Sequence, residues 1–487
     1  MMISIGIGAL VFAIWLIILF FGKTIGLSML LFVIPFSIFF IYILEKKGKV
    51  KNPSFKLLLI PIILLSSTYF IFDNVFFNKM NLIVIPVLHS ILVLGLLGEK
   101  FQINSDTVFM ILGTFFCPLG FIEESTLDFI DSIKENLKID IKSKNEAKIR
   151  KFLKAVLITV PVVLIIIFLL STADEIFADL FREAFRQILV FINGINLFNS
   201  LIKIIFIIIS FFYFMGLFYY VCLKYEVINE KEISQTKIND DFTIKMILVS
   251  LNIIYAVFCF IQVKSLFMRN TTLNYANYAR QGFFQLMIVS IINLVTILIA
   301  KKSENKDKVK INKFTNCMSI IMIVFTFIIV ISAWLRMSFY ENAYGYTMLR
   351  ILVYCALLTE VILFIPTVFY VLDKKINLLK SYFFIITIMY VCMNFANFDN
   401  IIARRNVDRF IQTGKIDIYY LITETGSDAV NQLLRILEIQ TGDENAKLET
   451  IEYLKEKYEY LNEEKIDFRN INLSKIFARN SIEKKIN

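Results

Sequence analysis

Residues 315–334 read TNCMSIIMIVFTFIIVISAW, a run that contains no charged residue. A helix of about 20 apolar residues crosses the hydrocarbon core of a bilayer. Backbone groups find no water in lipid, so a run of this kind must be helical there. Its apolar residues do not alternate with polar ones as the strands of a membrane barrel do. The stretch therefore predicts a transmembrane helix.

The same pattern recurs along most of the 487 residues, which are 57% hydrophobic with a mean hydropathy of +0.69. Soluble domains are about 45–50% apolar. The predicted fold is an all-α, polytopic transmembrane bundle of about 11 spans, or about 12 if 107–122 also crosses, with a small C-terminal helical tail. The predicted spans are 3–21, 25–44, 57–72, 81–97, 153–170, 200–222, 243–263, 283–300, 315–334, 349–371 and 381–397.

Lysines in the short loops predict the orientation. The segments 45–56 and 301–313 are rich in lysine and should be cytoplasmic. The basic region that follows 107–122 would break this rule if that segment crossed the membrane, so we expect 107–122 to be re-entrant or interfacial. The predicted organisation is 1–97 for the N-terminal spans, 98–154 for a cytoplasmic region, 153–397 for the main transmembrane region and 398–487 for a polar tail. The N-terminus is then cytoplasmic and the tail extracytoplasmic.

The tail has the pattern of short amphipathic helices, with Gly414 and Gly426 as breaks between them. Fewer than about 100 residues in such helices bury little surface by themselves. We expect the tail to dock on the membrane part or on itself.

Three polar groups lie at the face where the tail is predicted. Tyrosine and arginine at this face could bind an anion or a polar headgroup, because the guanidinium fork suits phosphate and carboxylate. The alternative is that they anchor the span ends and dock the tail, since tyrosine is enriched at membrane interfaces. The groups are Tyr275, Tyr278 and Arg280; Arg336, Tyr344 and Arg350; and Asn394, Asn397, Arg404 and Asn406.

These groups also carry a family resemblance. The run ANYARQGFFQL at 276–286 resembles a motif of uncharacterised bacterial multi-span proteins, which are classed as a membrane domain of unknown function. The segments 344–350 and IARRN at 402–406 are similar to further motifs of that family. Gln281 and Arg405 depart from its pattern. The resemblance implies a multi-pass protein of the bacterial cytoplasmic membrane and implies no reaction.

Glu360 lies in the middle of the predicted span 349–371, where a charge costs several kcal/mol unless it is paired, protonated or in a wet cavity. It is either a proton or cation relay or a protonated acid bonded to Asn252, Asn293 or a backbone carbonyl. His89 is the only histidine, and we expect it to be buried with its hydrogen bonds satisfied.

The sequence predicts no metal site and no cofactor. A lone histidine cannot assemble a zinc site, and the six cysteines lack metal-ligand spacing. No phosphate loop, dinucleotide fingerprint or kinase motif occurs.

The expected partner is the lipid bilayer. Anionic lipid could contact a surface helix within 123–154, although an ordinary basic loop is the alternative. The net charge of +10 lies mainly in loops, so no nucleic acid is implied, and no protein partner of the tail is indicated.

Several functions stay open. The chain could transport or handle a small solute or a lipid-linked species. It could instead be a sensor, scaffold or envelope assembly factor that presents its helical tail. A membrane enzyme is the least supported class, because Asp399, Glu341 and Glu424 are candidates by location alone.

Overall fold

The computed structural model describes residues 2–98, 107–137, 198–224, 241–267, 283–302, 309–373, 376–439 and 444–486. Its regular elements are all helical, and no strand occurs in these segments. In the described part of the chain, eight helices are long and apolar enough to cross a membrane, and two shorter apolar helices cover Lys245–Phe260 and Leu286–Lys301. This confirms an all-helical protein with the apolar helices of a membrane protein. The predicted span 153–170 lies outside the described residues.

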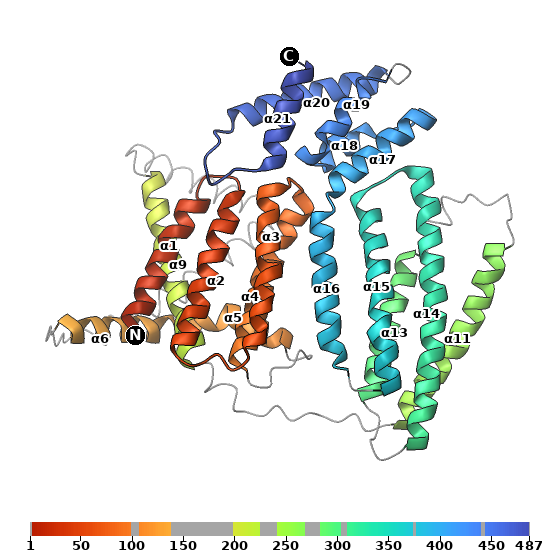
Figure 1. Cartoon of the computed structure of the whole chain (residues 1–487), viewed down its shortest axis with the longest axis horizontal. Coiled ribbons are helices and arrows are strands. Elements are labelled where there is room, and N and C mark those ends of the chain that lie inside the picture. Colours follow the sequence, from red (N-terminus) through yellow and green to blue (C-terminus); the bar gives the residue numbers. More distant parts are fainter. Residues whose placement is uncertain are drawn as a thin grey trace, which may run out of the picture.

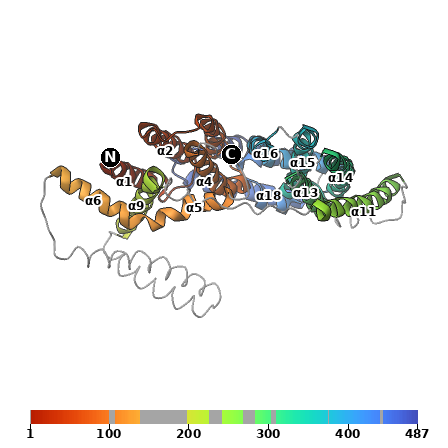
Figure 2. The same ribbon diagram turned by 90° about the horizontal axis from the view of Figure 1, so that it is seen from below.

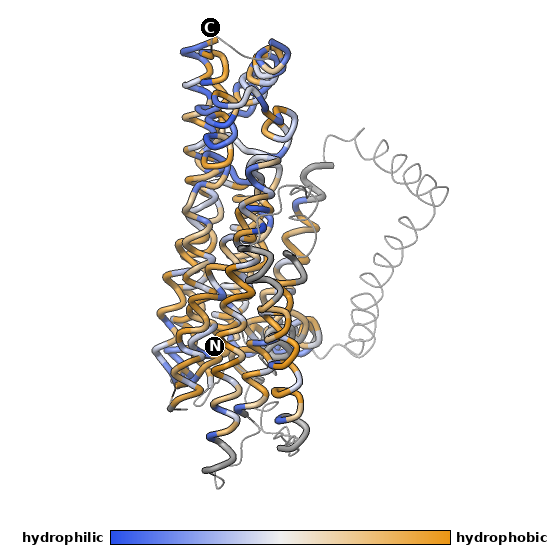
Figure 3. The backbone as a smooth tube through the Cα atoms, turned by 90° about the vertical axis from the view of Figure 1, so that its right-hand side faces the viewer, coloured by the Kyte–Doolittle hydropathy of each residue, from blue (hydrophilic) through white to orange (hydrophobic). Residues whose placement is uncertain are grey.

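The apolar helices stand side by side in the lower part of Figure 1. Their hydrophobic residues form a band in Figure 3, and the more hydrophilic tail lies above it. The upright helices are α1 (Met2–Phe20), α2 (Leu27–Lys46), α3 (Leu59–Ile71), α4 (Val75–Leu97), α9 (Phe198–Tyr219), α11 (Asp241–Phe267), α13 (Phe283–Lys302), α14 (Val309–Tyr344), α15 (Met348–Asp373) and α16 (Leu378–Phe395).

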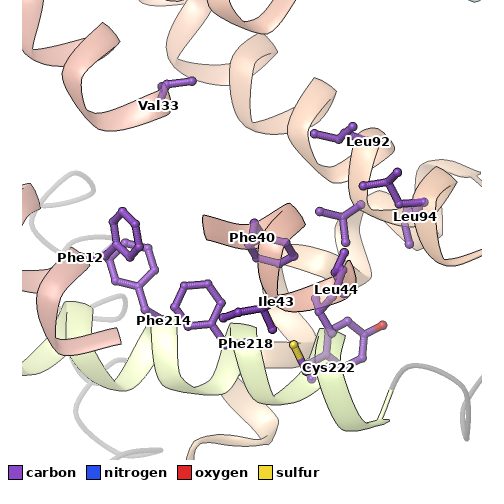
Figure 4. Close-up of a cluster of buried hydrophobic side chains, with 14 of the residues drawn as sticks. Phe12, Val33, Phe40, Ile43, Leu44, Leu92, Leu94, Phe214, Phe218 and Cys222 are labelled. Carbon is purple, nitrogen blue, oxygen red and sulfur yellow. The ribbon is translucent and has the colours of Figure 1, made fainter. Parts of the chain in front are cut away.

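The upright helices form two bundles, each with its own buried apolar cluster. The first bundle comprises α1 to α4 and α9, and the second comprises α11, α13, α14 and α15. Helix α16 lies between them and packs against α3 and α15. Phenylalanine rings fill the first bundle: the ring centroids of Phe12 and Phe214 lie 6.5 Å apart, and those of Phe40 and Phe218 lie 5.5 Å apart (Figure 4). Edge-to-face and tilted rings of this kind add stability beyond their buried area.

Helices α5 (Thr107–Gly120) and α6 (Ile122–Leu137) lie across the end of the first bundle that is opposite the tail, as Figures 1 and 2 show. Tyr219 of α9 donates a 2.7 Å hydrogen bond to Asp128 of α6. Helix α6 is mainly acidic, so the proposed contact with anionic lipid would fall on the lysines after residue 137, outside the described residues. Which side of the membrane this end faces stays a prediction.

The tail caps the other end of both bundles (Figure 1). Its helices pack on one another around Leu434, Leu454 and Ile482. Gly414 ends α17 with a left-handed φ of 69°, the conformation that glycine adopts without strain. The tail elements are α17 (Phe398–Thr413), α18 (Ile418–Glu424), the 3₁₀ turn η3 (Ser427–Ala429), α19 (Val430–Ile436), α20 (Glu444–Glu463) and α21 (Leu473–Ile486).

Candidate functional site

The chain enters the tail through a sharp turn at Asn397, whose φ is 49°. Asparagine is one of the few residues that tolerate this left-handed conformation. Its side chain accepts a hydrogen bond from the backbone N–H of Asn400 and so caps α17. The turn places Asp399 in the first turn of α17, against the loop between α3 and α4.

Asp399 is 1% exposed and holds the tail to that loop. Its Oδ1 accepts from Asn74 Nδ2 at 2.8 Å, and its Oδ2 accepts from the backbone N–H of Gly426 at 2.9 Å. One carboxylate therefore bonds to the first bundle and to a second part of the tail. Removal of the Asp399 carboxylate would leave two buried donors, Asn74 Nδ2 and the Gly426 N–H, without an acceptor.

A second set of bonds lies beside the first. The backbone N–H of Asp73 donates to Asp428 Oδ2 at 2.7 Å, and Ser427 Oγ donates to Asp73 Oδ2 at 2.5 Å. Gly426 fits here because it lacks a side chain: an added Cβ would lie 1.9 Å from the carbonyl oxygen of Asp73. We call this group the aspartate junction, which consists of Asp73, Asn74, Asp399, Gly426, Ser427 and Asp428.

Burial shifts the titration of two of these carboxyls. It raises the pKa of Asp399 to about 7, and the Gly426 N–H opposes the shift while Asp428 and Asp73 add to it. Burial also raises the pKa of Asp428 to about 6, and the Asp73 N–H opposes that shift. Both groups therefore bind a proton more tightly in the docked tail than in water.

Docking of the tail should weaken as the pH rises. Docking raises the pKa of these carboxyls, so proton binding favours the docked tail. This contribution to the docking free energy is fully present below the ordinary aspartate pKa of 3.8, and it is lost as the pH rises through the pKa of the docked state. We expect protection of α17 from hydrogen–deuterium exchange, corrected for intrinsic rates, to fall between about pH 4 and about pH 7, the range bounded by the ordinary and the docked pKa values. Asp399→Asn should flatten this dependence, and protection that rises with pH would contradict the assignment.

A buried amide network continues from the junction into the membrane part. Asn81 of α4 donates to Asn394 Oδ1 of α16 at 2.7 Å and accepts from the Tyr390 hydroxyl at 2.8 Å. The same amide nitrogen reaches Thr68 of α3 at 3.2 Å. Since buried polar groups are stable only when they are hydrogen-bonded, this network fixes α16 against the first bundle.

The tail also binds the second bundle. Asn406 of α17 accepts from the Tyr346 N–H at 3.0 Å and donates to the Tyr346 carbonyl at 2.8 Å, so it pairs with that backbone as a strand would. The Tyr420 hydroxyl accepts from the Met348 N–H at 2.7 Å. Arg350 lies 4.4 Å from the ring centroid of Tyr340 and donates to the Gly345 carbonyl, which holds the α14–α15 turn in place.

Further contacts join the last part of the tail to α1, α2 and α3. The N–H groups of Leu27 and Ser28 donate to the carbonyls of Ile471 and Arg469 at 3.1 and 2.9 Å. Asn472 Nδ2 donates to the carbonyls of Tyr69 and Phe72 at the end of α3. A Cβ added at Gly26 would lie 2.6 Å from the Ile471 carbonyl oxygen. The tail backbone therefore lies directly on the first bundle.

The structure unites two of the three predicted polar groups. Asn394 and Asn406 make the bonds described above, Asn397 caps α17, and Arg350 and Tyr344 lie at the α14–α15 turn. Arg404 is 68% exposed and lies 3.9 Å from Asp408 on its own helix, so it takes no part in the junction. Arg336 lies on α14, before the turn. Tyr275, Tyr278 and Arg280 lie outside the described residues.

The contacts of the united residues are docking contacts, which favours the anchoring interpretation of these groups. Sequence reasoning missed Asp73, Asn74, Asn81, Gly26 and Asn472. Two signals pointed to the first three: an Asp-Asn pair between two predicted spans, and an asparagine at the first position of the span 81–97. The partners of all five lie hundreds of residues away in sequence and could not be identified.

Glu360 accepts a 2.7 Å hydrogen bond from Ser290 of α13. The expected partners were wrong: Asn252 donates to the Met318 carbonyl, and Asn293 bonds to Tyr255 and Thr326. His89 is buried beside the rings of Phe36 and Phe40. Its Nε2 has no hydrogen-bond partner among the described residues, so the expected satisfied histidine was also wrong. No cluster of three potential metal ligands occurs within the described segments.

Comparison with known proteins gives a family and no activity. A family model described as a domain of unknown function, DUF4153, matches residues 59–436, which include the aspartate junction, Asn406 and Glu360. No curated protein and no solved structure matches the chain.

Proposed function

The chain belongs to the DUF4153 family of unknown function, and we propose that it is a membrane-embedded sensor or scaffold whose docked tail couples the two helical bundles. The carrying observation is that α17 bonds to both bundles. Asp399, near its start, binds Asn74 of the first bundle, and Asn406, two turns later, binds Tyr346 of the second.

Because α17 is bonded to both bundles, the distance between the bundles should depend on whether α17 is docked. Displacement of α17 breaks buried bonds to both bundles at once, and each unmet buried donor or acceptor costs about 1–3 kcal/mol. An event that releases the tail, such as binding of a partner or a change of pH, would thereby alter the membrane part. Such coupling requires a structural element with two states that both sites influence.

A second candidate, transport of a small solute or a lipid-linked species, rests on another observation. The second bundle contains a buried carboxyl, Glu360, in the middle of α15. Ionisable residues inside the membrane part commonly mark ion or substrate pathways.

Variants of the chromosomal gene distinguish the two candidates, with the phenotype of the gene deletion as reference. A tail-coupled sensor or scaffold predicts that Gly426→Ala reproduces the deletion phenotype while the protein is still inserted, and that Glu360→Gln does not. Transport predicts the reverse. Gly120→Ala is the control, because a Cβ at Gly120 meets nothing within 4 Å.

We further propose that the protein lies in a bacterial cytoplasmic membrane with its N-terminus inside and its tail outside. The lysine-rich loops support this orientation. In a cysteine-free background, a cysteine at the exposed Tyr419 of the tail should react with a membrane-impermeant thiol reagent on intact cells, and one at the exposed Lys46 should not. The reverse labelling would invert the orientation.

A further inference from the structure

Polar side chains gather near the middle of the second bundle, away from the tail. Tyr255 of α11 donates to Asn293 of α13 at 2.7 Å, and Asn293 donates to Thr326 of α14 at 2.9 Å. One turn along α13, Ser290 donates to Oε2 of Glu360 on α15 at 2.7 Å. Each of these residues lies near the midpoint of its helix.

Glu360 has an unmet bonding capacity. It is 5% exposed, and its Oε1 is buried without a hydrogen-bond partner among the described residues. Asn252 Oδ1 and Ser319 Oγ of the same bundle are in the same condition. The oxygens of Glu360 and Asn252 that lack a partner are hydrogen-bond acceptors, so the interior of the second bundle can accept a proton or another cation.

Within the described segments, no ion pair to the carboxylate of Glu360 occurs. The charges nearest to Glu360 along the described parts of the packed helices lie toward the ends of those helices. They are Lys245 on α11, Lys301 on α13, Lys313, Arg336 and Glu341 on α14, Arg350 and Asp373 on α15, and Lys380 on α16. On α16, Tyr382 pairs with Thr367, two turns beyond Glu360. A carboxylate ion that is buried inside a membrane bundle without a counter-ion is strongly unfavourable, and a bound proton removes its charge.

We propose that Glu360 and Ser290 form a proton-binding site inside the second bundle, at which the carboxyl alternates between its protonated and ionised states. Ser290 Oγ lies 2.7 Å from both Glu360 Oε2 and the Met287 carbonyl, so its hydroxyl can donate to the ionised carboxylate or turn to the carbonyl when the carboxyl is protonated. The buried Oε1 has no partner among the described residues and is free to take up the proton. The polar groups of Tyr255, Asn293 and Thr326, one turn away, provide the polar surroundings for proton exchange.

The test uses a hydrophobic carbodiimide on the full-length protein in liposomes. The protonated carboxyl adds across one C=N bond of the reagent, and the O-acylurea rearranges to a stable N-acylurea with no leaving group. Mass spectrometry then locates the adduct. We expect labelling of Glu360 that falls at least about tenfold between about pH 6 and about pH 9, as a titrating carboxyl requires.

Variants and salt make the outcomes decisive. Glu360→Gln should lose the adduct, and Ser290→Ala should extend labelling to higher pH, because the ionised state loses its donor. Labelling that does not change with pH would show a permanently protonated structural acid. Protection by sodium ions at constant pH would show a metal-cation site. Absence of labelling in folded protein would also overturn the proposal.

The proposed site does not depend on transport; only the use of the proton rests on the transport candidate. If Glu360 binds a proton but the protein shows no proton-coupled flux, the proton site stands and the transport candidate is wrong. If flux persists in Glu360→Gln, the transport candidate stands but Glu360 takes no part in it.

Discussion

Gly426→Ala is expected to lower the protection of α17 against hydrogen exchange by roughly a hundredfold, which is about 3 kcal/mol of docking free energy. The new Cβ would lie 1.9 Å from the Asp73 carbonyl oxygen and 2.9 Å from its carbon. Both atoms are backbone, so no side chain can rotate away, and the tail must shift. That shift stretches the bonds from Gly426 to Asp399 and from Ser427 to Asp73.

The matched control is Gly120→Ala, where the same added methyl group meets open space. It should leave the protection of α17 unchanged. Gly26→Ala tests the same contact surface at another point, because its Cβ would lie 2.6 Å from the Ile471 carbonyl oxygen. If Gly426→Ala behaves like Gly120→Ala, the tail does not lie against the α3–α4 loop as described.

Asp399→Leu is the second large effect, and we expect it to cost docking about 2–4 kcal/mol. It leaves Asn74 Nδ2 and the Gly426 N–H buried without acceptors, and each unmet donor costs about 1–3 kcal/mol. Part of this loss of docking free energy is offset, because the variant no longer buries a carboxylate. The offset is largest at high pH, where the carboxyl of Asp399 is ionised. The measured quantity is again the exchange protection of α17.

Asp408→Leu is the matched control on the same helix. Asp408 is 38% exposed and pairs with Arg435 at 2.8 Å, and an exposed ion pair of this kind contributes about 0–1 kcal/mol. Equal losses in the two variants would show that α17 is held by its helical face as a whole and not by the carboxylate of Asp399.

The helices could be predicted from the sequence because lipid makes one local rule decisive: a long apolar run must be helical. The helical tail and its breaks at Gly414 and Gly426 followed from local pattern as well. The number of spans is not confirmed, since 153–170 lies outside the described residues and the apolar parts of α11 and α13 are shorter than the other spans.

The junction could not be predicted, because it depends on pairing across the whole chain. Asp73 and Asp428 are 355 residues apart, and Asn81 and Asn394 are 313 apart. No local pattern selects one such pair among many polar residues. Glu360 was identified because charge is rare inside a span, but its partner Ser290 was missed, since a serine in an apolar helix gives no comparable signal.

The most direct test of the central claim measures the distance between the bundles. Spin labels would replace the exposed Lys79 at the start of α4 and the exposed Asn342 near the end of α14, in a cysteine-free protein in nanodiscs. Double electron–electron resonance should give one narrow distance distribution for the otherwise unchanged protein, and a broader one once Gly426→Ala has undocked the tail. The same narrow distribution in both proteins, with α17 undocked by hydrogen exchange, would show that the tail does not couple the bundles.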